Sequence, residues 1–519
     1  MKTIHLLCIW LGAFLPTAFC PAQNETTKSV FRFHSGLEPA TVDPAALNDA
    51  TGGFLFFNLY RSLYRLDEHN RPKLELAKKC DWLDSRLRLR LRCQLKSGLK
   101  FSNGENMTAN HWVLAWRRLI DPMTGSRHAE LLQPILNARA ISAGKLKPED
   151  LGVSAIDDRT LEIQLEEADP ELFFKLSAPV LTPIWQTPPL KPDTFAKAVT
   201  TGPYRIREWQ SKTRIRLEPN PYYFPIKSRP EVEILLIEED STALQMFDLG
   251  KLDFLRRLNI KEIPWRKSRK EFLFIPTYRF DYVGFGPELQ DQPELRKALA
   301  LSLDYAELTK AYLTPGKIGC PSLPRSLSEP WPCVKFDLKA AKAALAKADR
   351  SRFPELTLNY SRAGGEDVGR GMEWMQGQWK KHLGLNVALR PQESGMFMQQ
   401  IKTKAPALFR KGMNLNRPTC LAALESFTSF SRDNSLGLKN ENYDKLVGRL
   451  QNSQSEPSKK SLCGQALNLL IKEHRLIPLG ELYFAMLAKP QFRGWRVTPM
   501  NQLDLTDLEV TPPKPKDGP

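Results

Sequence analysis

The sequence lacks the short motifs that commonly mark an enzyme. It contains no HExxH zinc motif, no GxSxG nucleophile turn, no Walker phosphate loop and no GxGxxG dinucleotide fingerprint. Its seven histidines are scattered, and no two stand at a metal-ligand spacing. A pair of catalytic carboxylates assembled from distant residues would not be visible in a sequence. We therefore predict a binding protein rather than a hydrolase, with no metal and no cofactor.

Long apolar runs are also missing after the first twenty residues, so we expect no membrane-spanning helix in the mature chain. Lys2 and the apolar residues 4–19 resemble a signal peptide, and Cys20-Pro21-Ala22 fits cleavage after Ala22. A hydrophilic stretch, 23–29, follows at once and disfavours the alternative of a buried N-terminal helix. A lipid anchor on Cys20 is a second alternative, although a large residue precedes it. We predict a signal peptide over 1–22 and a periplasmic or otherwise extracytoplasmic protein.

Cysteines are few and show no zinc-binding spacing. The chain has eight, of which Cys8 and Cys20 fall in the predicted signal peptide, leaving six. No CxxC pair occurs, and no histidine lies near any pair. Six cysteines allow many pairings, and the sequence alone cannot choose among them. Short spacing favours disulfides Cys80–Cys93 and Cys320–Cys333, which would leave Cys420–Cys463.

Positive charge exceeds negative charge, with a net charge of +17 spread along the chain rather than gathered in one tail. Predicted export argues against nucleic acid as the partner. Two interpretations stay open. One is a solvated basic surface, and the other is attraction to an anionic ligand, acidic lipids or cell-wall polymers.

Strands and helices are mixed without strict alternation. Residues 87–92 alternate Leu and Arg, and 161–165 alternate apolar and polar residues, as half-buried strands do. Helical patterns follow Thr108 and run from 366 to 383, where Gly384 ends the second. A chain of 519 residues is too long for one ordinary domain. These patterns predict α/β lobes with mixed sheets.

An ordered series of short motifs spans nearly the whole mature chain. The segments are Glu38–Pro44, Asn58–Asp67, Leu95–Gly104 with Met107–Ala109, Thr201–Trp209, Asn220–Tyr223, and Leu295–Leu299 with Leu303–Asp304. Each motif alone is weak, but the series as a whole resembles the family 5 solute-binding proteins of ABC importers. That family includes oligopeptide, dipeptide and nickel binders. The motifs are scaffold motifs, so they identify the fold and say little about the ligand.

The resemblance implies a two-lobed periplasmic-binding-protein fold with mixed sheets, two hinge crossings and an inserted N-terminal subdomain. The expected boundaries are 23–64, 180–278 and 489–519 for lobe I, 65–179 for the inserted subdomain, and 279–488 for lobe II. It also implies a monomeric receptor that captures a peptide or similar small polar solute and delivers it to an ABC permease. The alternative is an orphan binding or sensing protein on the same fold, for example for cell-wall peptides. An extracellular hydrolase is disfavoured by the empty motif search.

The same resemblance locates the ligand site and shows where this chain differs. Peptide binders usually hold the ligand's α-amine with an Asp in the segment that here runs from Arg410 to Pro418. That position falls on Asn414, which lacks a carboxylate's charge, or is lost in a deletion. Arg417 adds a cation nearby, whereas Arg410 matches an Arg that can pair with a ligand carboxylate. The sequence therefore predicts a neutral or anionic ligand. The expected contacts are Arg410, Gly412, Met413, Asn414, Asn416, Arg417, His128, Ala50, Thr51 and Ser394.

Overall fold

The computed structural model describes most of the chain. The described residues are 29–36, 38–47, 50–188, 191–312, 323, 327–328, 334–349, 351, 355–362, 366–431 and 433–511. The predicted signal peptide with Cys20, the pair Cys320–Cys333 and the tail after 511 lie outside them. Within these ranges, no helix is both long enough and apolar enough to cross a bilayer.

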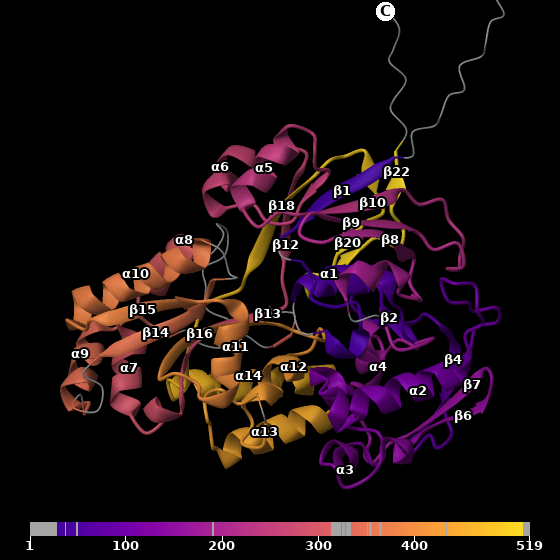
Figure 1. Cartoon of the computed structure of the whole chain (residues 1–519). Coiled ribbons are helices and arrows are strands. Elements are labelled where there is room, and N and C mark those ends of the chain that lie inside the picture. The colour runs from indigo at the N-terminus through magenta and orange to yellow at the C-terminus, as the bar shows by residue number, and fades with distance from the viewer. Residues whose placement is uncertain are drawn as a thin grey trace, which may run out of the picture.

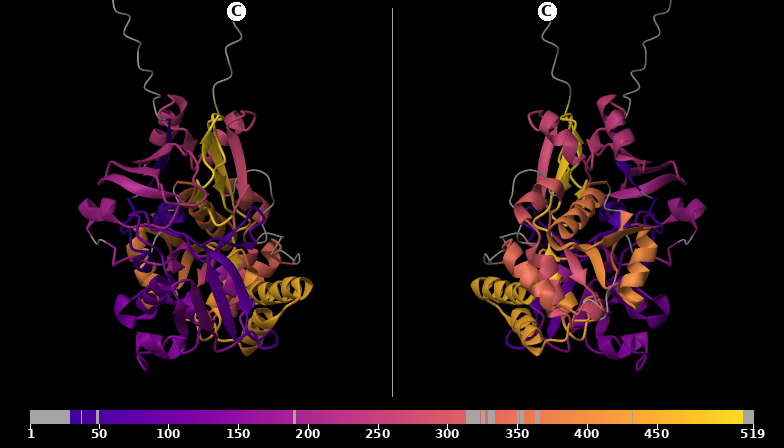
Figure 2. Two further views of the ribbon diagram at one scale, coloured as in Figure 1. Left: turned by 90° about the vertical axis from the view of Figure 1, so that its right-hand side faces the viewer. Right: turned by 90° about the vertical axis from the view of Figure 1, so that its left-hand side faces the viewer.

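A seven-stranded mixed sheet combines the first described strand with a strand from the C-terminal part of the chain (Figure 1). Its order is β12-β18-β11-β1-β10-β9-β8. The strands are β1 (Val30–Ser35), β8 (Tyr204–Gln210), β9 (Arg214–Pro219), β10 (Glu231–Leu236), β11 (Phe254–Leu255), β12 (Phe272–Pro276) and β18 (Tyr483–Ala488). Strands β10, β1 and β11 are parallel, so their carboxyl ends share one edge of the sheet. Figure 2 shows the yellow C-terminal segment beside the pink strand β12 in both views.

Three helices pack near this sheet. They are α1 (Ala50–Leu59), α5 (Asp240–Asp248) and α6 (Ile263–Arg266). Short strand pairs complete this part of the chain: β2 (Tyr64–Leu66) with β3 (Pro72–Leu74), β19 (Phe492–Arg493) with β22 (Glu509–Val510), and β20 (Arg496–Val497) with β21 (Leu503–Asp504). Helix α1 lies between the sheet and the β20–β21 pair, and its apolar residues join the same core as the sheet.

A five-stranded mixed sheet forms the second half of the molecule, drawn in orange in Figure 1. Its strands, in sheet order, are β15 (Val387–Gln392), β14 (Leu356–Ser361), β16 (Leu408–Asn414), β13 (Arg279–Phe285) and β17 (Leu476–Pro478). The helices of this half are α7 (Pro293–Leu301), α8 (Tyr305–Tyr312), α9 (Leu338–Lys347), α10 (Glu366–Leu383), α11 (Ser394–Thr403), α12 (Cys420–Leu424), α13 (Glu441–Asn452) and α14 (Glu456–Lys472). Sheet and helices share one core, which includes the fully buried Trp379 of α10.

A four-stranded antiparallel sheet makes up a third layer. Its strands are β4 (Ala77–Trp82), β5 (Arg90–Leu95), β7 (Thr160–Gln164) and β6 (Val153–Asp157), and its helices are α2 (Ala109–Ile120), α3 (Ala138–Ser142) and α4 (Leu172–Lys175). Strand β5 alternates in burial, with Leu91 and Leu95 facing the core. On its other face, Arg90 and Arg92 pair with the buried Glu162 at 2.6 and 2.8 Å.

Two disulfides occur among the described cysteines. Cys80 of β4 and Cys93 of β5 stand directly opposite each other and are bonded, which confirms that predicted pair. Cys420 of α12 is bonded to Cys463 of α14.

Two adjacent crossings connect the seven-stranded and five-stranded sheets. Thr277 lies in the first and donates from its backbone N–H and its hydroxyl to the carbonyl of Leu482 in the second, each at 3.0 Å. The expected end of lobe II at 488 is wrong, because β18 pairs with β11 and β12 in the seven-stranded sheet. The chain leaves the five-stranded sheet at Pro478. The other boundaries stay predictions.

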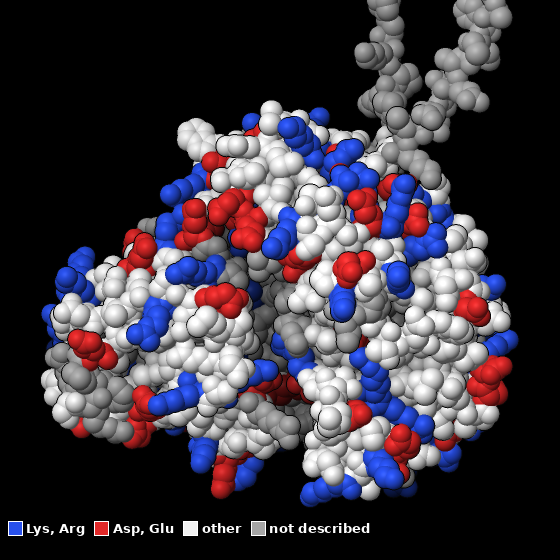
Figure 3. Space-filling model, in the orientation of Figure 1, with Lys and Arg blue, Asp and Glu red and all other residues white. Residues whose placement is uncertain are grey.

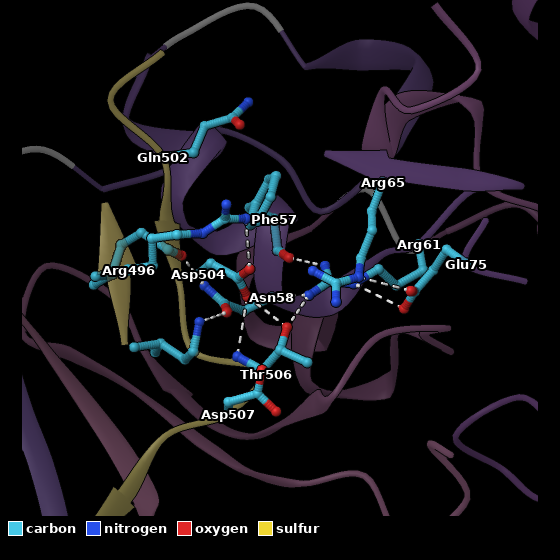
Figure 4. Close-up of polar contacts among 12 residues, drawn as sticks. Phe57, Asn58, Arg61, Arg65, Glu75, Arg496, Gln502, Asp504, Thr506 and Asp507 are labelled. Carbon is cyan, nitrogen blue, oxygen red and sulfur yellow. Dashed lines mark hydrogen bonds and ion pairs between the residues drawn. The ribbon is translucent and has the colours of Figure 1, made fainter. Parts of the chain in front are cut away.

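A buried arginine ties three distant segments together beside α1 (Figure 4). The Arg61 guanidinium lies 3.4 Å from Asp504 and 3.6 Å from Glu75, and it also donates to the Thr506 hydroxyl and the Phe57 carbonyl. Burial alone would lower the pKa of Arg61, but Tyr223, Asp504 and Glu75 raise it. This network fixes α1 to the C-terminal segment and to the start of the four-stranded layer.

Candidate ligand-binding site

A hollow separates the two halves of the molecule in Figure 3, with charged side chains of both signs along it. Contacts across it come from the chain that follows β16, where Asn416 and Arg417 project toward the four-stranded layer. These two residues belong to the motif in which the sequence predicts the ligand site. The same segment therefore joins the two halves and lies at the expected site.

Arg417 forms a buried ion triad across the hollow. Its Nε donates to Glu171 beside α4 at 2.7 Å, and its Nη2 donates to Glu425 of its own half at 2.8 Å. The residue is only 2% exposed. Burial alone would lower the pKa of Arg417, but Glu425 and Glu171 raise it above its usual value. We call Arg417, Glu171 and Glu425 the Arg417 triad. The protein itself neutralises this cation, so Arg417 does not by itself repel a ligand amine.

Glu130 supplies a second contact across the hollow. Its Oε1 accepts a hydrogen bond from Asn416 Nδ2 at 3.4 Å. Glu130 is an exposed residue, although protein crowds its carboxylate. Partial burial, together with the negative charges of Glu425 and Asp433, raises its pKa to about 7, against the opposing effect of Arg417 and Arg127. The cleft wall near Asn416 is therefore acidic.

Replacing Glu130 with glutamine should flatten the pH dependence of stability between about pH 4.5 and pH 7. The folded pKa lies above the unfolded value of 4.5, so the folded state binds the proton more tightly in this window. The contribution of Glu130 to the free energy of unfolding is then fully present below pH 4.5, and it is lost as the pH rises through about 7. Thermal unfolding of wild type and Glu130→Gln at several pH values measures the difference. Glu441→Gln, at an exposed helical site, is the control. Parallel wild-type and Glu130→Gln curves would contradict the assignment.

Several residues that were predicted to contact the ligand lie on β16. Their side chains contact residues of β13 rather than an open cleft. Arg410 is 5% exposed and pairs with the fully buried Asp281. Arg279 crosses over Gly412, where a Cβ atom would lie 2.0 Å from its Nη2, so a larger residue there would require the Arg279 side chain to move. Arg279 also donates to Asn414 Oδ1 at 3.2 Å. The expectation that Arg410 offers a free cation to a ligand carboxylate does not fit this geometry, because Asp281 already compensates its charge.

The remaining predicted contacts are more dispersed. His128, in the 3₁₀ helix Arg127–Leu132, donates from Nε2 to the Leu47 carbonyl at 2.7 Å. Burial and Arg127 lower its pKa to about 4, against the effect of that hydrogen bond. Ala50 and Thr51 begin α1, and their side chains are outside the described part. Met413 packs against the core of its half. Ser394 begins α11, and no contact in the described ranges joins it to the Arg417 triad.

The sequence analysis missed the acidic partners and Arg279. Glu171 and Glu130 lie far from Arg417 along the chain, and only the fold brings them together. Glu130 is two residues from His128, so its place on the same wall was open to inference. Among the described residues, no group of three or more His, Cys, Asp or Glu side chains is arranged to hold a metal ion.

Comparisons with known proteins agree with this architecture. The family described as bacterial extracellular solute-binding proteins, family 5 middle, matches residues 71–435. The chain is 28% identical to the probable deoxycholate-binding periplasmic protein YgiS of Escherichia coli K12, over 95% of this chain and 96% of that protein. It is 26% identical to the dipeptide-binding protein DppE of Bacillus subtilis 168, over 90% and 89%.

Among solved structures, the murein tripeptide-binding protein MppA of Escherichia coli shares the fold. Its TM-score is 0.80 at 22% identity, covering 93% of this chain and 98% of that one. An unliganded open form of MppA, also at 22% identity, scores 0.69, covering 93% and 97%. These relatives are binding proteins rather than enzymes. The chain belongs to the family 5 bacterial extracellular solute-binding proteins and is a solute receptor of the importer type.

Proposed function

We propose that this protein captures a peptide or a similar small polar solute between its lobes, without relying on a free α-amine, and delivers it to an ABC permease. The observation that carries the ligand class is the Arg417 triad. It places a protein cation between Glu171 and Glu425, where the family resemblance locates the anchor for a ligand ammonium. A ligand ammonium would have to compete with Arg417 for Glu171 and Glu425, and without a carboxylate partner in a closed cleft it would lose several kcal/mol of solvation.

The names of the relatives support two ligand chemistries. DppE is named for dipeptides, whereas YgiS is named for deoxycholate, an anion with no amine. Asn414 replaces the expected Asp, and its Oδ1 already accepts a hydrogen bond from Arg279. It is therefore not available to a ligand amine, which favours a ligand without one. The mature receptor begins after Ala22, works outside the cytoplasm as a monomer, and signals capture by closing its lobes.

Mass spectrometry of what co-purifies with the protein, followed by calorimetry, tests this proposal. The titrants are one tripeptide with a free N-terminus, its N-acetylated form, and deoxycholate. We expect acetylation to leave the affinity within a few-fold, because the Arg417 triad needs no ligand amine. Loss of binding on acetylation would show that a carboxylate such as Glu130 holds the amine. Failure to bind any member of a broad solute library would contradict the receptor role itself.

A further inference from the structure

Arg256 lies at the carboxyl edge of the seven-stranded sheet. It follows β11 directly, and β11 runs parallel to β1 with Phe254 opposite Phe33. In open α/β sheets, ligands bind outside the carboxyl ends of the parallel strands. The chain just beyond Arg256 reaches the other half, since Asn259 Nδ2 lies 3.5 Å from its acceptor Glu366 Oε2, at the start of α10. Arg256 therefore lies close to the junction of the two lobes.

No carboxylate among the described residues pairs with Arg256. Its guanidinium carbon sits 3.5 Å from the centroid of the Phe54 ring, and its Nε is shielded from solvent without a hydrogen-bond partner. The residue as a whole is half-buried, so part of it keeps access to solvent. Burial and the neighbouring Arg257 lower its pKa to about 9, against a weaker opposite effect from Asp240. A cation held in this way destabilises a protein unless an anion joins it.

Other buried arginines show how this chain ordinarily compensates such a charge. Arg61, Arg410 and Arg417 each contact at least one carboxylate, whereas Arg229 and Arg296 donate to backbone carbonyls. Arg257, the next residue after Arg256, pairs with Asp240 at 2.7 Å. Arg256 instead lies over the ring of Phe54, the fifth residue of the ten-residue helix α1.

His34 adds a second polar group at this edge. It is 3% exposed and its Nδ1 is buried without a hydrogen-bond partner. Burial, Arg256 and Arg257 lower its pKa to about 3, so the ring is neutral at ordinary pH. A neutral imidazole can donate one hydrogen bond to an anion without adding to the positive charge.

We propose that Arg256 binds a carboxylate of the ligand, with His34 as an additional donor, so that the captured solute is an acid. The inference rests on the proposed function and deepens it. A guanidinium presents parallel N–H groups that match a carboxylate. The Phe54 ring packs against the guanidinium carbon and so restricts the movement of the Arg256 side chain. The role of carboxylate anchor, predicted for Arg410, is assigned to Arg256 because Asp281 already compensates the charge of Arg410.

Matched probes that differ only in the acid test the proposal by calorimetry. The pairs are one N-acetylated tripeptide with its C-terminal amide, and deoxycholate with its methyl ester. In whichever of the two pairs it binds, we expect the wild-type protein to bind the acid at least tenfold more tightly than the neutral counterpart. Arg256→Met should lose this preference while keeping its affinity for the neutral probe, and Arg256→Lys should keep part of it. An unchanged preference in Arg256→Met, or none in wild type, overturns the proposal and leaves the receptor role intact.

The stability of the ligand-free protein gives an independent readout. Removing a cation that has no partner should leave the melting temperature of Arg256→Met equal to or above that of wild type. Arg61→Met is the matched comparison, since it removes a compensated arginine beside the end of the same helix. A drop for Arg256→Met as large as that for Arg61→Met would show a structural role and overturn the proposal. This result is obtained whether or not any probe binds.

Discussion

Replacing Arg61 with methionine is expected to lower the free energy of unfolding by about 3–5 kcal/mol, the usual cost of leaving buried charges without their partner. The substitution removes one of the two cations beside each carboxylate, since only Arg496 then remains near Asp504 and only Arg65 near Glu75, and it removes the donor to Thr506. Arg61 also holds the pKa of Asp504 below its usual range despite burial, together with contacts from Thr506. Urea denaturation followed by tryptophan fluorescence measures the loss.

Arg207→Met is the matched control for this experiment. Arg207 also pairs with a carboxylate, Glu231, at 3.0 Å, but the arginine is 51% exposed. Its removal should cost less than about 1 kcal/mol because solvent screens exposed pairs. Equal denaturation midpoints for Arg61→Met and Arg207→Met would contradict the structural role of the Arg61 network shown in Figure 4.

Replacing Arg417 with methionine is expected to weaken ligand binding by about 3 kcal/mol, or roughly a hundredfold in Kd. Glu171 then stays buried without a cation, and the strongest described contact between the two lobes is lost. The lobes should separate in the ligand-free protein, which small-angle X-ray scattering detects as a larger radius of gyration. The preference between ligands should also shift, because two carboxylates become free to hold an ammonium.

The shift in preference separates this role from a purely structural one. Arg417→Met should gain affinity for a tripeptide with a free α-amine relative to its N-acetylated form. Glu425→Gln is the control, since it leaves the pair between Arg417 and Glu171 across the hollow in place. The assignment fails if both variants bind the two tripeptides in the same ratio as wild type.

Local patterns predicted the elements well where one face of the chain is buried. The predicted helix over 366–383 matches α10, and Thr108 directly precedes α2 as expected. The alternation over 87–92 predicted a strand that begins three residues too early. Leu87 is exposed, and the strand runs over Arg90–Leu95, where pairing with β7 decides its bounds. A leucine-arginine alternation has the right period but does not fix its own ends.

The candidate site was predicted less well, because the charges that neutralise one another there belong to residues that lie far apart in the sequence. The motif singled out Asn416 and Arg417, which contact Glu130 and Glu171 in the structure, and their role as ligand contacts stays a prediction. It could not show that Glu171 neutralises Arg417, or that Asp281, on the neighbouring strand β13, neutralises Arg410. Arg256 carried no motif. Its position after a parallel strand becomes visible only once the order β10-β1-β11 is known.

The position of β18 determines which of the two lobes can finish folding first during synthesis. Strand β12 has β18 as its neighbour in the sheet, and Asn58 of α1 bonds to the backbone of Leu503 and Leu505. These contacts join residues that are synthesised hundreds of positions apart. The first lobe therefore stays unfinished throughout translation, with an open sheet edge until the last strand emerges. The second lobe has all of its strands before that point, so folding should begin there and end at the N-terminal half.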